Sequence, residues 1–180
     1  MATRVLVLSD THLPGRARSL PPSVLEAAAQ ADLIVHAGDL VSLDVYDELA
    51  LLAPVIAVHG NVDDPEVYRR LPGRAVFERD GVRVGVTHGH LGRAPTTPAR
   101  ALEAFAAEDP RPAVVIFGHS HQPLIERRDG VLLVNPGSPT DPRRAPAPSY
   151  AWVELNGGEA RARLVELQNP RAPGRRAPAT

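Results

Sequence analysis

The sequence contains no cysteine and no lysine. The missing cysteine excludes disulfide frameworks, thiolate metal sites, iron–sulfur clusters and cysteine nucleophiles. The missing lysine excludes Schiff-base catalysis and the lysine of a phosphate-binding loop. Any metal must therefore bind through nitrogen and oxygen. All 20 basic residues are arginine, which we interpret as a bias of genomic composition.

Long apolar runs and a strong net charge are also missing. No run approaches the roughly 18 residues of a membrane-spanning helix, and the N-terminus lacks the features of a secretory signal, so we expect a cytoplasmic protein. A net charge of −1 over 180 residues gives no bulk attraction for nucleic acid or a membrane surface, and we expect neither as a partner. The length favours a single domain over residues 1–168. The Pro-, Arg- and Ala-rich residues 169–180 are expected to form a disordered tail.

The hydrophobic pattern predicts an alternating β-α start and a hairpin-rich end. Buried strands are expected at residues 4–8, 33–36, 54–58 and 113–117, and helices at 24–31, 42–52 and 97–107. Hairpins are expected to pair 75–78 with 82–87, 122–128 with 131–134, and 150–155 with 159–167. Together they predict an α/β (α+β) protein with mixed sheets. Residues 136–149 hold five prolines without periodicity, and we interpret them as an ordered surface loop or lid.

The predicted strands in the first two-thirds of the chain end in short polar runs. These runs are Asp10-Thr-His12, Gly38-Asp39, Gly60-Asn61-Val62-Asp63, His88-Gly-His90 and Gly118-His-Ser-His121. Ligand sites of open α/β sheets lie at such strand ends. One run alone is weak evidence for a metal site, since Asn61 also fits turn chemistry and Asp39 also fits a helix cap. Five runs in one chain indicate a polar centre that needs a cation to compensate it.

In this order the runs resemble the motifs of the calcineurin-like metallophosphoesterases, and in particular of the small YfcE-like phosphodiesterases. The similarity continues to Asn135-Pro-Gly-Ser138 and covers about residues 3–168. It implies a four-layer α-β-β-α sandwich, in which two mixed β-sheets lie face to face with helices outside. It also implies two divalent metal ions, with manganese as the first choice and iron, zinc, nickel or cobalt as alternatives.

The resemblance also implies a role for each residue of the motifs. One metal is implied to bind Asp10, His12 and His121, and the other Asn61, His88 and His119. The carboxylate of Asp39 is implied to bridge the two metals. Two cations roughly 3.5 to 4 Å apart lower the pKa of a shared water, and the resulting hydroxide attacks a phosphate ester. The neutral Asn61 adds no negative charge and is also assigned to substrate binding.

His90 lies beyond the implied ligands and is assigned to the substrate. It is expected to donate a hydrogen bond or transfer a proton at the phosphate, or to support a neighbouring ligand. Val62 stands where many larger relatives carry a histidine that protonates the leaving group. This difference favours substrates with good leaving groups, or another acid such as His90. Asp63 is expected to orient a ligand or its loop.

The remaining candidates are given structural roles or left open. His36 lies inside an apolar strand and is interpreted as a core histidine bonded to backbone, whereas His59 is either structural or a support for a ligand. Three loop arginines face either solvent or a second phosphate or leaving group of the substrate: Arg16, Arg18 and Arg93. The Asn135-Pro-Gly-Ser138 segment either orders the floor of the site through backbone amides or forms a fixed turn.

The leading hypothesis is a dimetal phosphodiesterase, or a broader phosphoesterase, acting on a small phosphate ester. The alternative is a non-catalytic protein-binding scaffold, because a eukaryotic retromer subunit resembles this fold with an altered site. The presence of every implied ligand favours catalysis. A nuclease of the same superfamily is disfavoured because the sequence shows neither a basic groove nor a DNA-binding domain. Relatives commonly dimerise, so a homodimer stays open.

Overall fold

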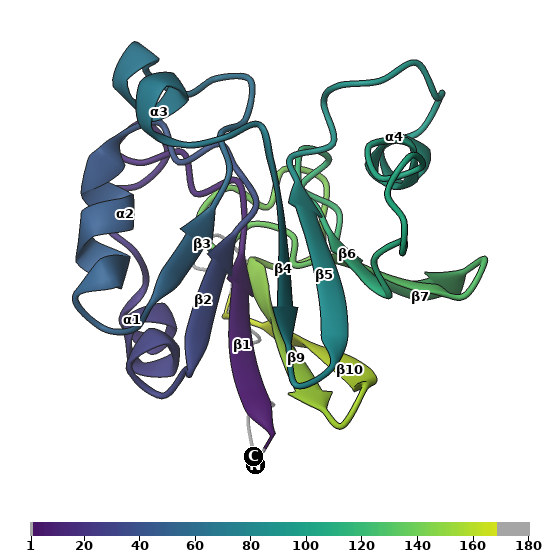
Figure 1. Ribbon diagram of the computed structural model, residues 1–180. Helices are drawn as coiled ribbons and strands as arrows, with labels where there is room; N and C mark the ends of the chain where they lie inside the picture. Colours follow the sequence, from purple (N-terminus) through teal and green to yellow (C-terminus); the bar gives the residue numbers. More distant parts are fainter. Residues whose placement is uncertain (1, 169–180) are drawn as a thin grey trace, which may run out of the picture.

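The computed structural model describes residues 2–168 and shows two five-stranded β-sheets with helices on their outer faces (Figure 1). The strand order is β10-β9-β1-β2-β3 in the first sheet and β4-β5-β6-β8-β7 in the second. The strands are β1 (Thr3–Leu8), β2 (Leu33–His36), β3 (Val55–Ala57), β4 (Arg74–Arg79), β5 (Val82–Thr87), β6 (Val114–Ile116), β7 (Leu124–Arg128), β8 (Val131–Asn135), β9 (Ser149–Asn156) and β10 (Glu159–Glu166). The helices are α1 (Pro22–Ala29), α2 (Leu43–Ala50), α3 (Pro65–Arg70) and α4 (Thr97–Glu103). The predicted sandwich of two mixed sheets is confirmed.

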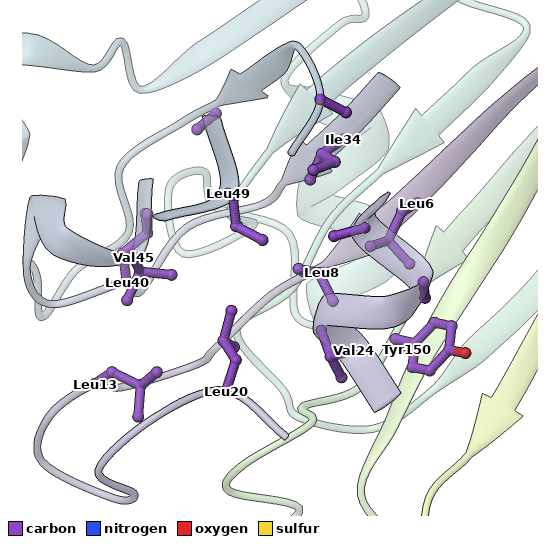
Figure 2. Close-up of a cluster of buried hydrophobic side chains, with 14 of the residues drawn as sticks. Leu6, Leu8, Leu13, Leu20, Val24, Ile34, Leu40, Val45, Leu49 and Tyr150 are labelled. Atoms are coloured by element: carbon purple, nitrogen blue, oxygen red, sulfur yellow. The ribbon is translucent and has the colours of Figure 1, made fainter. Parts of the chain in front are cut away.

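The first sheet explains the continuous apolar run near the N-terminus. β1 pairs in parallel with β2 and antiparallel with β9, so that Val5 lies between Leu33 and Val153. Because β1 is covered on both faces, its successive side chains are apolar. Leu6 and Leu8 point toward α1 and α2, and the cluster there includes Tyr150 (Figure 2). No helix among residues 2–168 is long and apolar enough to cross a membrane.

The second face of the first sheet packs on the second sheet. Val5, Val7 and Val153 join Val84 and Val134 in a cluster between the sheets. A third cluster, which includes Phe105 and Phe117, lies where α4 covers the outer face of the second sheet (Figure 1). The three clusters define the α-β-β-α layers.

The three predicted hairpins are present, and their turns have the backbone that their sequences favour. Asp80 and Gly81 between β4 and β5 both have positive φ, 50° and 75°. Asp129 and Gly130 between β7 and β8 repeat this pattern, with φ of 51° and 82°. Such turns match the right-handed twist of the paired strands.

The expectations differ from the structure at three places. The helix expected at 97–107 ends at Glu103, because the amides of Phe105 and Ala106 donate to carbonyls only three residues earlier. The six-residue α3 has no apolar periodicity and was not expected. Residues 136–139 are buried, so the start of the Pro-rich segment packs into the protein and is not a lid. The predicted tail, residues 169–180, lies outside the described residues.

Candidate metal centre

All five polar runs come together at one edge of the sandwich. They follow the carboxyl ends of β1, β2 and β3 in the first sheet and of β5 and β6 in the second. The arrows of β2, β3 and β5 point toward this edge (Figure 1). The site is therefore built from both sheets, as the rule for strand ends predicts.

Two carboxylates each use one oxygen to hold the chain and point the other inward. Asp10 is fully buried, and its Oδ2 accepts hydrogen bonds from the Ser9 hydroxyl at 2.6 Å and the His119 amide at 3.0 Å. Its Oδ1 has no hydrogen-bond partner among the described residues. Asp39 Oδ1 accepts from the Asn61 and Val62 amides at 2.8 and 3.1 Å. Ser42, and not Asp39, caps α2, since the Asp44 amide donates to the Ser42 hydroxyl. The helix-cap alternative for Asp39 is therefore wrong.

Backbone carbonyls fix the orientation of two imidazoles. His88 Nδ1–H donates to the Ala37 carbonyl at 2.8 Å, and His121 Nδ1–H donates to the Asp141 carbonyl at 2.5 Å. The Nε2 atom of each neutral ring then carries a lone pair. Those lone pairs face carboxylate oxygens, with His88 Nε2 3.2 Å from Asp39 Oδ2 and His121 Nε2 3.3 Å from Asp10 Oδ1. A lone pair and a carboxylate repel each other unless a cation lies between them, so this donor set fits a metal.

The other predicted ligands surround these atoms. His12 Nε2 lies 3.2 Å from His121 Nε2 and 3.5 Å from Asp39 Oδ2. Asn61 Oδ1 and His119 Nδ1 are 3.0 Å apart. Two groups have ligand atoms that all lie within 4.8 Å of one another, namely Asp10, His12 and His121, and Asp10, Asp39 and His88. The structure thus brings the seven predicted ligands together, while their division between two metals stays a prediction.

Two polar side chains, one at the end of β2 and one within these runs, do not face the centre. The Gly38 amide donates to His36 Nδ1 at 3.2 Å, so His36 Nε2–H donates to the Thr11 hydroxyl at 3.1 Å. Both ring nitrogens are used, which confirms the buried structural role of His36. Asp63 accepts the amides of Asp39, Val41 and Gly60. It therefore orients these two runs, as expected.

His90 and His59 lie at the rim. The ring centroid of His90 is 5.3 Å from that of His88 and 6.3 Å from that of His119, and its Nδ1 is buried without a partner among the described residues. Burial, followed by the charges of His88 and His119, lowers the pKa of His90 to about 4. His59 donates to the Gly60 carbonyl at 3.0 Å and packs on Tyr68. His90 is thus neutral near pH 7 and suited to hydrogen bonding.

The Asn135-Pro-Gly-Ser138 segment supports the site through side chains, whereas its Gly137 amide donates within the segment to Asn135 Oδ1. Asn135 Nδ2 donates to the Gly118 carbonyl and the Ser120 hydroxyl, both at 3.0 Å. The Ser138 hydroxyl donates to the Asp10 carbonyl at 2.7 Å. Sequence reasoning missed these contacts, as it missed the contact of Asp141 with His121. The polar residues of the segment were the available signal.

Several of the predicted ligand residues adopt a backbone conformation that L-amino acids rarely use. Positive φ values of 55°, 47°, 58°, 69° and 57° occur at Asp10, His12, Asp39, His119 and His121. Each costs roughly 1 to 2 kcal/mol for a residue with a Cβ. Such strain persists where the surrounding contacts require it and clusters at functional sites. The runs are therefore shaped for the position of their side chains and not for local stability.

The pKa values show how a proton takes the place of a cation. Burial raises the pKa of Asp10 to about 7, although His88 and the Ser9 hydroxyl oppose the shift. Burial opposes charge on His88 too, but Asp39 and Asp10 raise its pKa above the usual value. Burial lowers the pKa of His121 to about 4, and the charge of Arg143 adds to this shift. The raised pKa values of Asp10 and His88 thus favour uptake of a proton by the metal-free centre.

We expect metal affinity to fall as the pH drops below about 7. Asp10 is ionised above its raised pKa and protonated below it, so a metal must displace a proton in acid, whereas His121 stays neutral down to about pH 4. Each displaced proton weakens apparent affinity about tenfold per pH unit. Calorimetric titration with Mn(II) at pH 8, 7 and 6 measures this. Equal affinity at pH 8 and pH 6 would contradict it.

Comparison with known proteins agrees with this geometry. The model of the calcineurin-like phosphoesterase superfamily domain matches residues 3–158. A probable metallophosphoesterase of Methanothermobacter thermautotrophicus is 39% identical over 165 residues, covering 91% of this chain and 92% of that protein. A phosphodiesterase of Methanocaldococcus jannaschii is 28% identical over 148 residues, covering 74% and 82%. The crystal structure of zinc-bound wild-type Vps29 from Entamoeba histolytica has a TM-score of 0.72 at 25% identity, covering 91% of this chain and 98% of that one. The chain belongs to the calcineurin-like phosphoesterase superfamily.

Proposed function

We propose that the protein is a phosphodiesterase that hydrolyses small phosphate esters with two divalent metal ions, manganese being the first candidate. The observation that carries this proposal is the pair of buried, inward-facing atoms without a partner among the described residues, Asp10 Oδ1 and His88 Nε2. Bound cations supply an activated water and offset the negative charge on the phosphoryl group. The whole of residues 1–168 would serve as one catalytic domain.

We assign the ligand positions as the family resemblance implies. Asp10, His12 and His121 would hold one metal, Asn61, His88 and His119 the other, and Asp39 both. The contacts support this assignment: Asp39 Oδ2 lies near both His12 and His88, at 3.5 and 3.2 Å. Asn61 contributes a neutral oxygen, which leaves the centre attractive to an anionic ester. His90 would donate a hydrogen bond to the substrate phosphate.

A protein-binding scaffold is the second candidate, because the vacuolar protein sorting-associated protein 29 of Schizosaccharomyces pombe is 26% identical over 189 residues. The convergence of the ligand side chains favours catalysis. A scaffold has no use for strained backbone at Asp10, Asp39 and His121, where φ is 55°, 58° and 57°. The named phosphodiesterase relative supports diesters as the substrate class.

The decisive experiment measures hydrolysis and metal content together. The purified protein with Mn(II) is expected to release p-nitrophenol from bis(p-nitrophenyl) phosphate faster than from the monoester p-nitrophenyl phosphate. Calorimetry should show two bound metals per chain. A protein that binds two metals but hydrolyses neither ester would refute the proposal and favour the scaffold.

His90→Ala is expected to lower kcat for the diester by about 100-fold, because one hydrogen-bond donor to the developing charge is typically worth that much. His90→Gln should recover most of the activity, since its amide also donates. Affinity for Mn(II), measured by calorimetry, should not change in either variant. If His90→Gln is as impaired as His90→Ala, His90 transfers a proton instead of donating a hydrogen bond. Wild-type activity in His90→Ala would show that His90 does not act on the substrate.

A further inference from the structure

A pair of arginines, Arg16 and Arg143, lies next to the metal centre, with Asp141 between the pair and His121. Asp141, whose carbonyl accepts the His121 hydrogen bond, points its carboxylate Oδ2 between them. The Nε atoms of Arg16 and Arg143 each lie 3.5 Å from this oxygen. Two guanidinium groups thus share a single carboxylate, which leaves an excess positive charge beside the centre.

The two arginines keep most of their hydrogen-bonding capacity. Each guanidinium has five N–H donors, and the contact with Asp141 involves only the Nε edge. Among residues 2–168, none of the terminal NH₂ groups of Arg16 and Arg143 has a hydrogen-bond partner. The side chains of Arg16 and Arg143 are 62% and 48% exposed. The pair can therefore bind a planar or tetrahedral anion without losing its contact with Asp141.

The arginines also line a groove of about 930 Å³. Its walls include Thr140 and Asp141 next to the centre, prolines of both neighbouring loops, and Glu166 at the end of β10. The groove is large enough for part of a small ligand. Its acidic Glu166 disfavours a long polyanion. Across the whole groove the two arginines are balanced by Asp141 and Glu166, so the attraction for an anion is local to the arginine pair and suits one further anionic group there.

The backbone of Arg143 supports a functional role. Its φ is 47°, in the left-handed region that costs a residue with a Cβ roughly 1 to 2 kcal/mol. Neighbouring Arg144 is also exposed but does not have positive φ. The residue that contacts Asp141 thus keeps a backbone conformation that costs free energy.

We propose that Arg16 and Arg143 form an anion subsite, and that the preferred substrates are phosphodiesters with a second, terminal phosphate. This inference rests on the proposed function. Water adds to the scissile phosphorus, the bond to the leaving oxygen breaks, and that oxygen takes up the proton lost by water, giving a phosphomonoester and an alcohol. The terminal phosphate stays intact and holds the substrate on the arginine pair.

The test compares dinucleotides that differ only in the terminal phosphate. With Mn(II), kcat/KM for dTpdT carrying a 5′- or a 3′-phosphate is expected to exceed that for unmodified dTpdT by about tenfold or more, because charge-assisted hydrogen bonds are worth that much. Arg16→Gln and Arg143→Gln should each reduce this preference, mainly through KM, and should affect hydrolysis of bis(p-nitrophenyl) phosphate, which has no terminal phosphate, much less than that of the phosphorylated dinucleotides. Arg18→Gln is the control, since Arg18 is an exposed arginine of the same loop outside the groove.

Binding provides a readout that does not depend on turnover. Calorimetry with the Mn(II)-loaded His90→Ala variant, in which hydrolysis is expected to be about 100-fold slower, should show tighter binding of at least one phosphorylated dinucleotide, and adding Arg143→Gln should abolish the difference. Equal kcat/KM and equal affinity for the three dinucleotides would overturn the subsite. So would a preference that survives in both arginine variants. If neither the dinucleotides nor the p-nitrophenyl esters are hydrolysed while the binding preference is present, the proposed function fails and the anion subsite stands.

Discussion

Asp39→Asn is expected to lower kcat/KM for bis(p-nitrophenyl) phosphate by more than about 100-fold, since even residues that only support a metal ligand typically change activity 10- to 100-fold. Asparagine can still accept the Asn61 and Val62 amides through its oxygen. Its NH₂ group then faces His88 Nε2, where Asp39 Oδ2 lies at 3.2 Å. A donor at this position repels a cation, and a neutral group cannot balance two of them.

The same substitution should leave the metal-free fold intact. The new NH₂ group can donate to the His88 lone pair, so thermal unfolding in a chelator should occur near the wild-type temperature. Adding Mn(II) should raise the unfolding temperature of the wild-type protein, since a ligand at 100 times its Kd stabilises by about 2.7 kcal/mol, but not that of the variant. Asp47→Asn is the control, because that carboxylate is 59% exposed on α2. Wild-type activity in Asp39→Asn would exclude the bridging role.

Gly60→Ala is expected to disrupt the centre without changing any ligand. A Cβ at this position would overlap Asp39 Oδ1 and lie 2.5 Å from the Asp39 amide nitrogen. Since the backbone of Asp39 cannot move without losing its contact with Asp63, the overlap should displace the Asp39 carboxylate, which we propose bridges the metals. We expect a loss of about 1 to 3 kcal/mol in the free energy of unfolding. Affinity for Mn(II) should fall with it, as measured by urea unfolding and calorimetry.

Gly15→Ala provides a matched comparison for this prediction. Gly15 lies in a loop next to the same site, but a Cβ there would meet only the His12 carbonyl at 3.5 Å, an ordinary contact. Neither Gly15 nor Gly60 has positive φ, so the two substitutions differ in steric overlap and not in backbone strain. Unchanged Mn(II) affinity in Gly60→Ala would show that the carboxylate tolerates displacement.

Local patterns were sufficient for the strands, the hairpins and the polar side chains that the structure brings together, whereas the α-β-β-α layers and the ligand roles were implied by the resemblance to a known family. Alternation and turn chemistry predicted each hairpin, and polar runs at strand ends predicted which side chains would meet. The helix α3 was missed because its six residues bury only Val67, so no periodicity marks it. The end of α4 depends on backbone hydrogen bonds that no residue type in the segment dictates.

The finer organisation of the centre could not be predicted, since it comes from contacts between distant segments. The carbonyl that orients His88 belongs to Ala37, 51 residues away, and the one that orients His121 belongs to Asp141. A carbonyl acceptor leaves no trace in the sequence, because every residue has one. The positive φ of Asp10 and Asp39 is equally hidden, because the residue types next to them in the sequence do not predict it. The arginine pair became visible only when Asp141 was placed between its members.

The two sheets contribute different side chains to the centre. Both carboxylates, Asp10 and Asp39, follow strands of the first sheet, whereas His88 and His121 follow strands of the second. Neither sheet alone carries all of the proposed ligands, so we expect a cation to be retained only when the two layers are docked in their final register. Metal binding is thus thermodynamically linked to the union of the sheets. Loss of the cation should be an early event in unfolding, and metal release can serve as a direct reporter of the layers coming apart.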